Sequence, residues 1–175
     1  IDAGGSGSEP SFLTNVDGTL YFRAYDDSNG CELWKTDGTE AGTVMVADIN
    51  SGSSNSNPSY LTNVDGTLYF TAADGPHGEE LWTSDGTAEG TLMLKDINEV
   101  MLPSNPTSFI EVGGITYFIA DDGVHGEELW KTDGTEAGTV MVADIYSGSS
   151  NSGLAYLTNI GGTLYFAAND GSNGY

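Results

Sequence analysis

Basic residues are scarce in this chain. Four Lys or Arg residues stand against 26 Asp or Glu, which gives a formal net charge of −22 at pH 7. Binding to nucleic-acid backbones and to anionic lipids depends on clustered Lys and Arg. The composition therefore excludes a nucleic-acid-binding protein and argues against binding to anionic membranes. Such a surface suits cations, salty surroundings or a basic partner, or simply keeps the protein soluble.

Cysteine and long apolar runs are also nearly missing. Cys31 is the single cysteine, so no disulfide can form within the chain, and an intermolecular link is the one disulfide left open. No apolar run approaches the roughly 18 residues of a membrane helix, so we expect no membrane insertion. Glycine is frequent, with 25 residues, and no long apolar stripe has a period of 3.6. These absences predict an all-β chain.

A repeat organises what is present. Trp34, Trp82 and Trp130 lie 48 residues apart, and a Tyr-Phe pair at residues 21, 69, 117 and 165 keeps the same step. We divide the chain into repeats at 10–57, 58–105 and 106–153 and a partial repeat at 154–175, with residues 1–9 as the end of a preceding repeat. We therefore expect a piece of a longer array. A period of 20–50 residues is typical of propellers, solenoids and arrays.

Each repeat predicts four strands. In the first repeat they cover residues 10–16, 19–25, 32–36 and 43–49. Asp17-Gly18 joins the first two strands and predicts a type I′ hairpin, in which both central residues need positive φ. Both faces of the predicted sheet carry apolar side chains, so each sheet needs a neighbour on either side. We expect tandem four-stranded antiparallel blades of a β-propeller or part of one, with an open filament of stacked sheets as the alternative.

The run Glu-Leu-Trp-x-x-Asp-Gly-Thr fills residues 32–39, 80–87 and 128–135. It resembles a bacterial tandem-repeat family named after this ELWxxDGT motif. The resemblance covers almost the whole chain, because a following Gly-Thr and Asp-Ile recur in each full copy. It implies a large secreted or surface-attached protein with propeller-like blades and no well-established enzymatic activity. It implies no ligand.

Acidic loops after the second predicted strand are candidate cation sites. Residues 74–80 and 122–128 combine glycine with several carboxylates, and calcium prefers six to eight oxygen ligands. The candidate metal ligands, on ligand type alone, are Asp26, Glu32, Asp74, Glu80, Asp122, Glu128 and Asp170. Asp48, Asp96 and Asp144 are the reserve candidates. The alternative for all of them is a solvated turn.

Three other recurring features have a functional and a structural interpretation. His77 and His125 occupy equivalent positions and could approach zinc, but zinc needs three or four close ligands, so we favour loop histidines without metal. Asp37 and its equivalents fit an Asx-turn better than a metal site. The tryptophans lie in the middle of predicted strands, which favours a core role over sugar stacking.

No catalytic motif is recognisable in the chain. There is no Ser-His-Asp ordering, phosphate loop or Cys-x-x-Cys. We expect a non-enzymatic extracellular or cell-surface module, structural or adhesive, that acts through self-association or contact with a surface glycan or protein, with calcium as a hypothetical stabiliser. The alternative is a multivalent carbohydrate-binding propeller, and a hydrolase ranks third.

Overall fold

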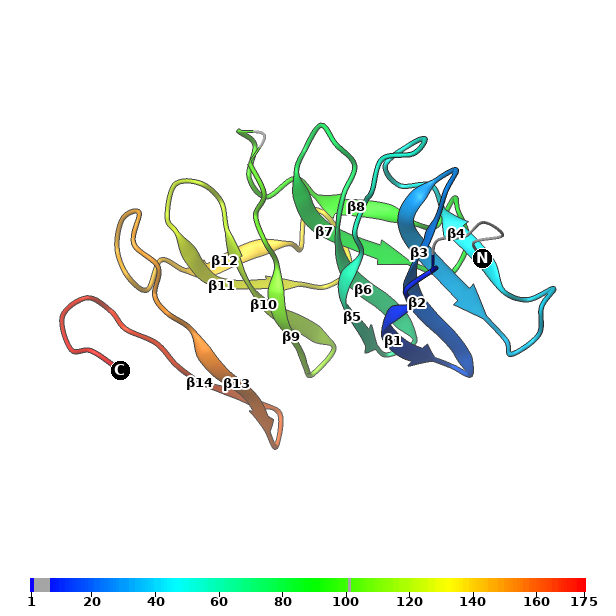
Figure 1. Cartoon of the computed structure of the whole chain (residues 1–175). Coiled ribbons are helices and arrows are strands. Elements are labelled where there is room, and N and C mark those ends of the chain that lie inside the picture. Colours follow the sequence, from blue (N-terminus) through cyan, green and yellow to red (C-terminus); the bar gives the residue numbers. More distant parts are fainter. Residues whose placement is uncertain (2–6, 101) are drawn as a thin grey trace.

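Four consecutive antiparallel sheets make up the fold (Figure 1). The computed structural model describes residues 1, 7–100 and 102–175. Residues 2–6, in the predicted end of a preceding repeat, and Met101 lie outside the described residues. In the described part of the chain there are fourteen strands and no helix, so the all-β prediction is confirmed. Each sheet is a meander in which neighbouring strands follow one another in the sequence.

Three sheets have four strands and the fourth has two, within the described residues. The first contains β1 (Ser11–Val16), β2 (Thr19–Asp26), β3 (Gly30–Thr36) and β4 (Val44–Ala47). The second contains β5 (Ser59–Val64), β6 (Thr67–Ala73), β7 (Glu79–Ser84) and β8 (Leu92–Lys95). The third contains β9 (Thr107–Val112), β10 (Ile115–Asp121), β11 (Glu127–Thr132) and β12 (Val140–Ala143), and the fourth β13 (Ala155–Ile160) and β14 (Thr163–Ala167).

The hairpin between the first two strands of each sheet has the predicted geometry. Asp17 and Gly18 have φ of 48° and 88°, and the equivalent Gly161 and Gly162 have 60° and 82°. These are the two positive angles that a type I′ turn requires. The side chain of Asn15 accepts the Gly18 amide at 2.9 Å, which fixes the start of the turn. The predicted hairpins are therefore confirmed.

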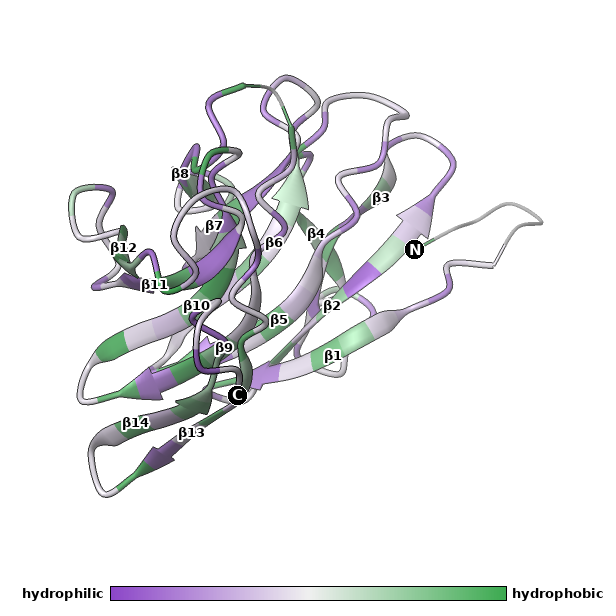
Figure 2. Ribbon diagram, turned by 90° about the vertical axis from the view of Figure 1, so that its left-hand side faces the viewer, coloured by the Kyte–Doolittle hydropathy of each residue, from purple (hydrophilic) through white to green (hydrophobic). Residues whose placement is uncertain are grey.

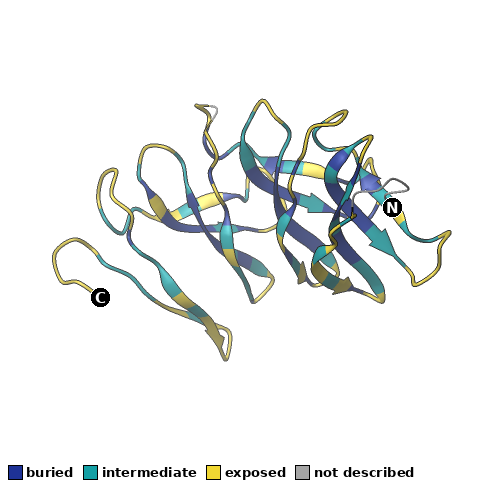
Figure 3. Cartoon of the chain, in the orientation of Figure 1, coloured by how far each residue is buried: buried dark blue, intermediate teal, exposed yellow. Residues whose placement is uncertain are grey.

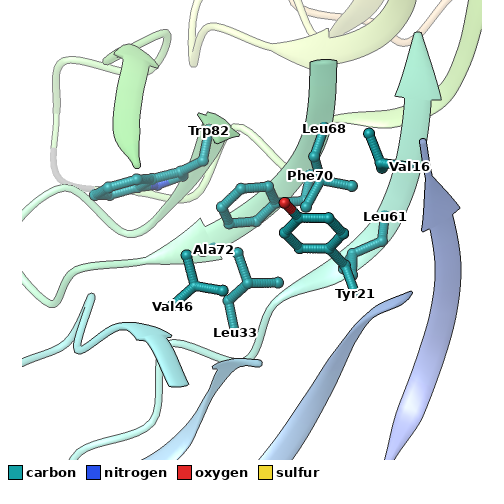
Figure 4. Packing of buried hydrophobic residues seen from close by; sticks show 9 residues of the cluster. All are labelled: Val16, Tyr21, Leu33, Val46, Leu61, Leu68, Phe70, Ala72 and Trp82. Carbon is teal, nitrogen blue, oxygen red and sulfur yellow. The ribbon is translucent and has the colours of Figure 1, made fainter. Parts of the chain in front are cut away.

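Apolar residues from facing sheets interlock to form the core. Between the first two sheets, Tyr21 and Leu33 pack against Phe70 and Trp82 (Figure 4). The complete set is Val16, Tyr21, Leu33, Val46, Leu61, Leu68, Phe70, Ala72 and Trp82. Full burial of a Leu or Phe side chain stabilises the fold by about 1.5–3 kcal/mol, so this contact holds the two sheets together.

The second sheet is apolar on its other face as well. Tyr69, Leu81 and Leu94 face the third sheet, where Phe118 and Trp130 meet them. Successive side chains of a strand point to opposite faces, so Tyr69 and Phe70 serve different interfaces. The predicted need of each sheet for two neighbours is therefore satisfied at the second sheet.

The first strands of the sheets lie next to one another. Contacts join β1 to β5, β5 to β9 and β9 to β13, and Figure 2 shows these strands along one side of the molecule. Asn63 Nδ2 donates to the Asn15 carbonyl at 3.0 Å, and Asn159 Nδ2 donates to the Glu111 carbonyl at 2.9 Å. These hydrogen bonds from side-chain amides join residues 48 positions apart and hold the neighbouring first strands in register.

The two-stranded fourth sheet is far more exposed than the others (Figure 3). Tyr165 in β14 is 55% exposed, whereas its equivalent Tyr21 is 6% exposed. Tyr21 is covered by the second sheet, and no sheet follows β14 in the described residues. The fourth sheet contains only the first two strands of a repeat, so the contacts that cover Tyr21 have no counterpart at Tyr165 among the described residues.

Candidate functional site

The glutamates that open the Glu-Leu-Trp motif are fully buried: Glu32, Glu80 and Glu128. The carboxylate of Glu80 accepts hydrogen bonds from the Ile97 amide at 2.9 Å, the Ser104 amide at 3.2 Å and the Ser104 hydroxyl at 2.6 Å. It thus ties the third strand of its sheet to the link that leads into the next sheet.

The other two glutamates make equivalent ties with small differences. Glu32 accepts from the Ile49 amide and from the amide and hydroxyl of Ser56. Glu128 accepts from the amides of Ile145 and Tyr146. All three were predicted as cation ligands, and the structure shows their carboxylates engaged by the chain itself.

Burial sets the protonation of two of these carboxyls. Desolvation raises the pKa of Glu32 to about 7 and that of Glu80 to about 7, although the hydrogen bonds they accept act in the opposite direction. A buried carboxylate loses hydration that few hydrogen bonds replace completely. Both side chains therefore take up a proton near neutral pH.

The loop aspartates are hydrogen-bonded within their own loops. Asp26 accepts the amides of Ser28 and Asn29 at 2.7 and 2.8 Å. Asp170 accepts the amides of Ser172 and Asn173 in the same way. Desolvation is the largest single influence on the pKa of Asp26 and raises it, but the hydrogen bonds together lower that pKa, and hydrogen bonds also lower the pKa of Asp170. Asp170 is exposed, as the solvated-turn alternative expects, whereas Asp26 is buried within its turn.

Histidine completes the loops of the second and third sheets. His77 Nδ1 lies 2.7 Å from Asp74 Oδ2, and His125 Nδ1 lies 2.7 Å from Asp122 Oδ2. The hydrogen bond to the aspartate raises the pKa of each histidine above its ordinary value. Each histidine therefore pairs with a single carboxylate inside its own loop.

The predicted cation ligands are not gathered into one group. Asp74 is bonded to its loop and Glu80 to the following link. Among the described residues no three His, Cys, Asp or Glu side chains are placed to hold a metal ion together. Of the reserve candidates, Asp48 accepts a hydrogen bond from the Gly52 amide. Asp96 and Asp144 each have one buried carboxylate oxygen without a hydrogen-bond partner among the described residues. Calcium binding remains a prediction.

The Asp-Gly-Thr hairpin is an Asx-turn, as predicted. Asp37 Oδ1 accepts the amide of Thr39 at 2.9 Å and its hydroxyl at 2.7 Å. The carboxylate lies against Gly42, where an added Cβ would collide with it. Gly42, which follows the motif, is therefore required by the aspartate side chain.

The tryptophans belong to the core, which confirms the structural interpretation. Trp34, Trp82 and Trp130 are each less than a tenth exposed. Trp82 and Trp130 pack in the two inter-sheet clusters, and Trp34 packs with Phe22 on the outer face of the first sheet.

A second set of aromatic residues was missed by the sequence reasoning. Each first strand contains a bulge, and a residue in it has positive φ. These residues are Phe12 at 54°, Tyr60 at 53°, Ser108 at 59° and Tyr156 at 59°. Positive φ is unusual for bulky side chains and costs about 1–2 kcal/mol. The only sequence signal is an aromatic residue at equivalent positions of three repeats.

The bulges hold their aromatic side chains in solvent. Phe12 is 41% exposed and Tyr60 is 48% exposed, and their ring centroids lie 6.4 Å apart. Arg23, from β2, lies with its Cζ 4.9 Å from the centre of the Phe12 ring. These three residues line a hollow of about 420 Å³ together with Glu79 and Asn105. Because the first strands adjoin one another, this hollow lies on the side of the molecule that they form.

Comparison of the chain with protein-family models and with curated proteins finds no match. The resemblance to the ELWxxDGT repeats therefore remains an expectation drawn from the motif. No helical segment of the described residues has the length and apolar character of a membrane span.

Proposed function

We propose that this chain is a non-enzymatic adhesive repeat module of the cell exterior that works through contact along its first strands. The observation that carries the proposal is the set of exposed aromatic residues Phe12, Tyr60 and Tyr156, displayed from bulges with positive φ. A residue with a strained backbone and an exposed side chain is typical of binding surfaces. Bulges also serve to re-aim side chains.

The non-enzymatic role is supported by how the motif residues are used. Glu80 ties two segments together, Asp85 closes its own Asx-turn and Trp82 fills the core. The residues that recur in every full copy are therefore occupied by folding. The exposed side chains of the first strands are aromatic and polar, with aliphatic Leu13 and Ile160 beside them, which fits a glycan or a protein surface better than a reaction.

We propose further that the sheets are blades of a β-propeller. Adjacent first strands, meander topology and apolar packing on both faces of a sheet support this arrangement. A multivalent surface would follow, in which avidity grows with each equivalent contact.

A glycan array probed with the tagged chain tests the adhesive function. We expect binding to a subset of glycans and its loss when Phe12, Tyr60 and Tyr156 are all replaced by Ala. Unchanged binding by this variant would overturn the assignment to the first-strand surface. A melting temperature close to that of the wild type serves as the folding control.

A further inference from the structure

The junction of the first two sheets carries an arrangement that the repeat does not copy. The rings of Phe12 and Tyr60 lie 6.4 Å apart, and the guanidinium of Arg23 lies over Phe12 at 4.9 Å. At the next junction Ser108 occupies the position of the second aromatic ring, and Thr71 occupies that of Arg23. An aromatic pair with a cation is therefore a property of this single place.

The positive charge of Arg23 has no carboxylate partner in the part of the chain that the structure describes. The ion pairs found there join only histidine to aspartate, although the chain has 26 acidic residues. Arg23 Nε donates to Ser11 Oγ at 3.2 Å, and the Phe12 ring lies beneath the guanidinium. These contacts hold the side chain in place. A planar guanidinium is the side chain best suited to bind a carboxylate through two parallel hydrogen bonds.

The remainder of the hollow is suited to hydroxyl groups. Glu79 and Asn105 contribute a carboxylate and an amide, and Ser59 contributes a hydroxyl. Hydrogen bonds to Thr71 at 2.8 and 2.9 Å hold Ser59 and Glu79 in place. The volume of about 420 Å³ falls within the range of small-molecule sites. Aromatic faces supply apolar area against which the C–H face of a sugar ring can pack. Apolar, hydrogen-bonding and cationic groups thus meet within one hollow.

We propose that the Phe12–Tyr60–Arg23 hollow binds a sugar that carries one carboxylate, at the end of an otherwise neutral glycan. One cation matches one carboxylate. A polyanionic glycan would meet repulsion from a chain of net charge −22 along its whole length. This inference rests on the proposed function, because it assumes that the first-strand surface meets glycans.

Calorimetric titration of the full chain with sialyllactose and with lactose tests the proposal, since the two probes differ by the acidic sugar. We expect sialyllactose to bind about 10-fold or more tightly than lactose, as a charge-assisted pair provides. Arg23→Met should abolish this preference and leave the weak affinity for lactose within about 3-fold. Tyr60→Ala should weaken the binding of both sugars.

Leu92→Ala is the control, because Leu92 is exposed in β8 of the second sheet and does not line the hollow. It should leave both affinities unchanged. Equal affinities for the two sugars, a preference that survives Arg23→Met, or no binding of either sugar would each overturn the site. If the wild type then still binds other glycans on the array, the proposed function stands without this site. If it binds none, both fail.

Discussion

Replacing the buried Glu80 by Gln should remove much of the pH dependence of the second sheet's stability. Burial raises the pKa of Glu80 to about 7 from an ordinary 4.5. The folded protein therefore holds this proton more tightly than the unfolded chain does. The stabilising contribution is fully present below pH 4.5 and is lost as pH rises through 7. A shift of this size corresponds to about 3 kcal/mol.

Urea unfolding of the wild type and Glu80→Gln at several pH values between 4 and 8 measures this contribution. The glutamine stays neutral, so the wild type should lose about 3 kcal/mol relative to the variant over this range. The variant also places an amide group against a backbone donor, which adds an offset of about 1 kcal/mol that does not depend on pH. The change of the difference with pH, not its size at one pH, is the informative quantity.

Glu89→Gln is the matched control, because Glu89 is exposed in the hairpin loop of the same sheet. Its curve should run parallel to that of the wild type. Parallel curves for Glu80→Gln as well would mean that folding gives Glu80 no extra affinity for a proton, and the argument from burial would be wrong.

Three further predictions concern the loops. Gly90→Ala should destabilise the fold by about 1–3 kcal/mol, because its Cβ collides with the carboxylate of Asp85. Gly7→Ala, whose Cβ would make only an ordinary van der Waals contact with Glu9, should be neutral in thermal melts, and equal melting temperatures for both variants would contradict the collision. The pKa of His77, followed by NMR, should lie above its ordinary 6.5, so the stability that its pairing with Asp74 contributes is present at lower pH and is lost as pH rises through the raised pKa. Asp74→Asn should return the pKa toward its ordinary value, and an unshifted pKa in the wild type would refute the pairing. Calcium in the acidic loops predicts a lower melting temperature after chelation, restored by added calcium; no change would show that the loops' own hydrogen bonds suffice.

Much of the fold was predictable because the decisive signals are local. The pair Asp17-Gly18 demands two positive φ values in adjacent residues, and the structure supplies them. The core role of Trp82 follows from its place inside a strand beside Leu81. Such features depend on neighbouring residues and on the 48-residue step, both of which a sequence displays directly.

The role of the motif glutamate was not predictable in the same way. Glu80 meets Ser104, a residue 24 positions away in a link that has no regular secondary structure. An acidic residue next to a loop of carboxylates resembles a cation ligand until its partners are known. A serine at the equivalent link position of every repeat, as in Ser56 and Ser152, was the signal available.

The bulges were hidden for a different reason. The pairing register of β1 and β2 shifts at the bulge. Strand β1 is short and half exposed, so its pattern of hydrophobic and polar residues does not reveal this shift. A phenylalanine at position 12 does not predict a positive φ, because glycine is the residue that normally adopts one. The exposed aromatic surface therefore becomes visible only when the strands are placed side by side.

Residues that recur in every repeat and residues that differ between repeats have different roles in this chain. A residue such as Glu80 or Trp82 recurs because every sheet must solve the same problem of joining its neighbour. Arg23 is not needed to join neighbouring sheets, because the second sheet has Thr71 at the equivalent position and still packs against the third sheet. A binding specificity that belongs to one place has to be carried by residues of this second kind. The fold thus directs the search for function away from the motif and toward the unequal positions of the first two strands.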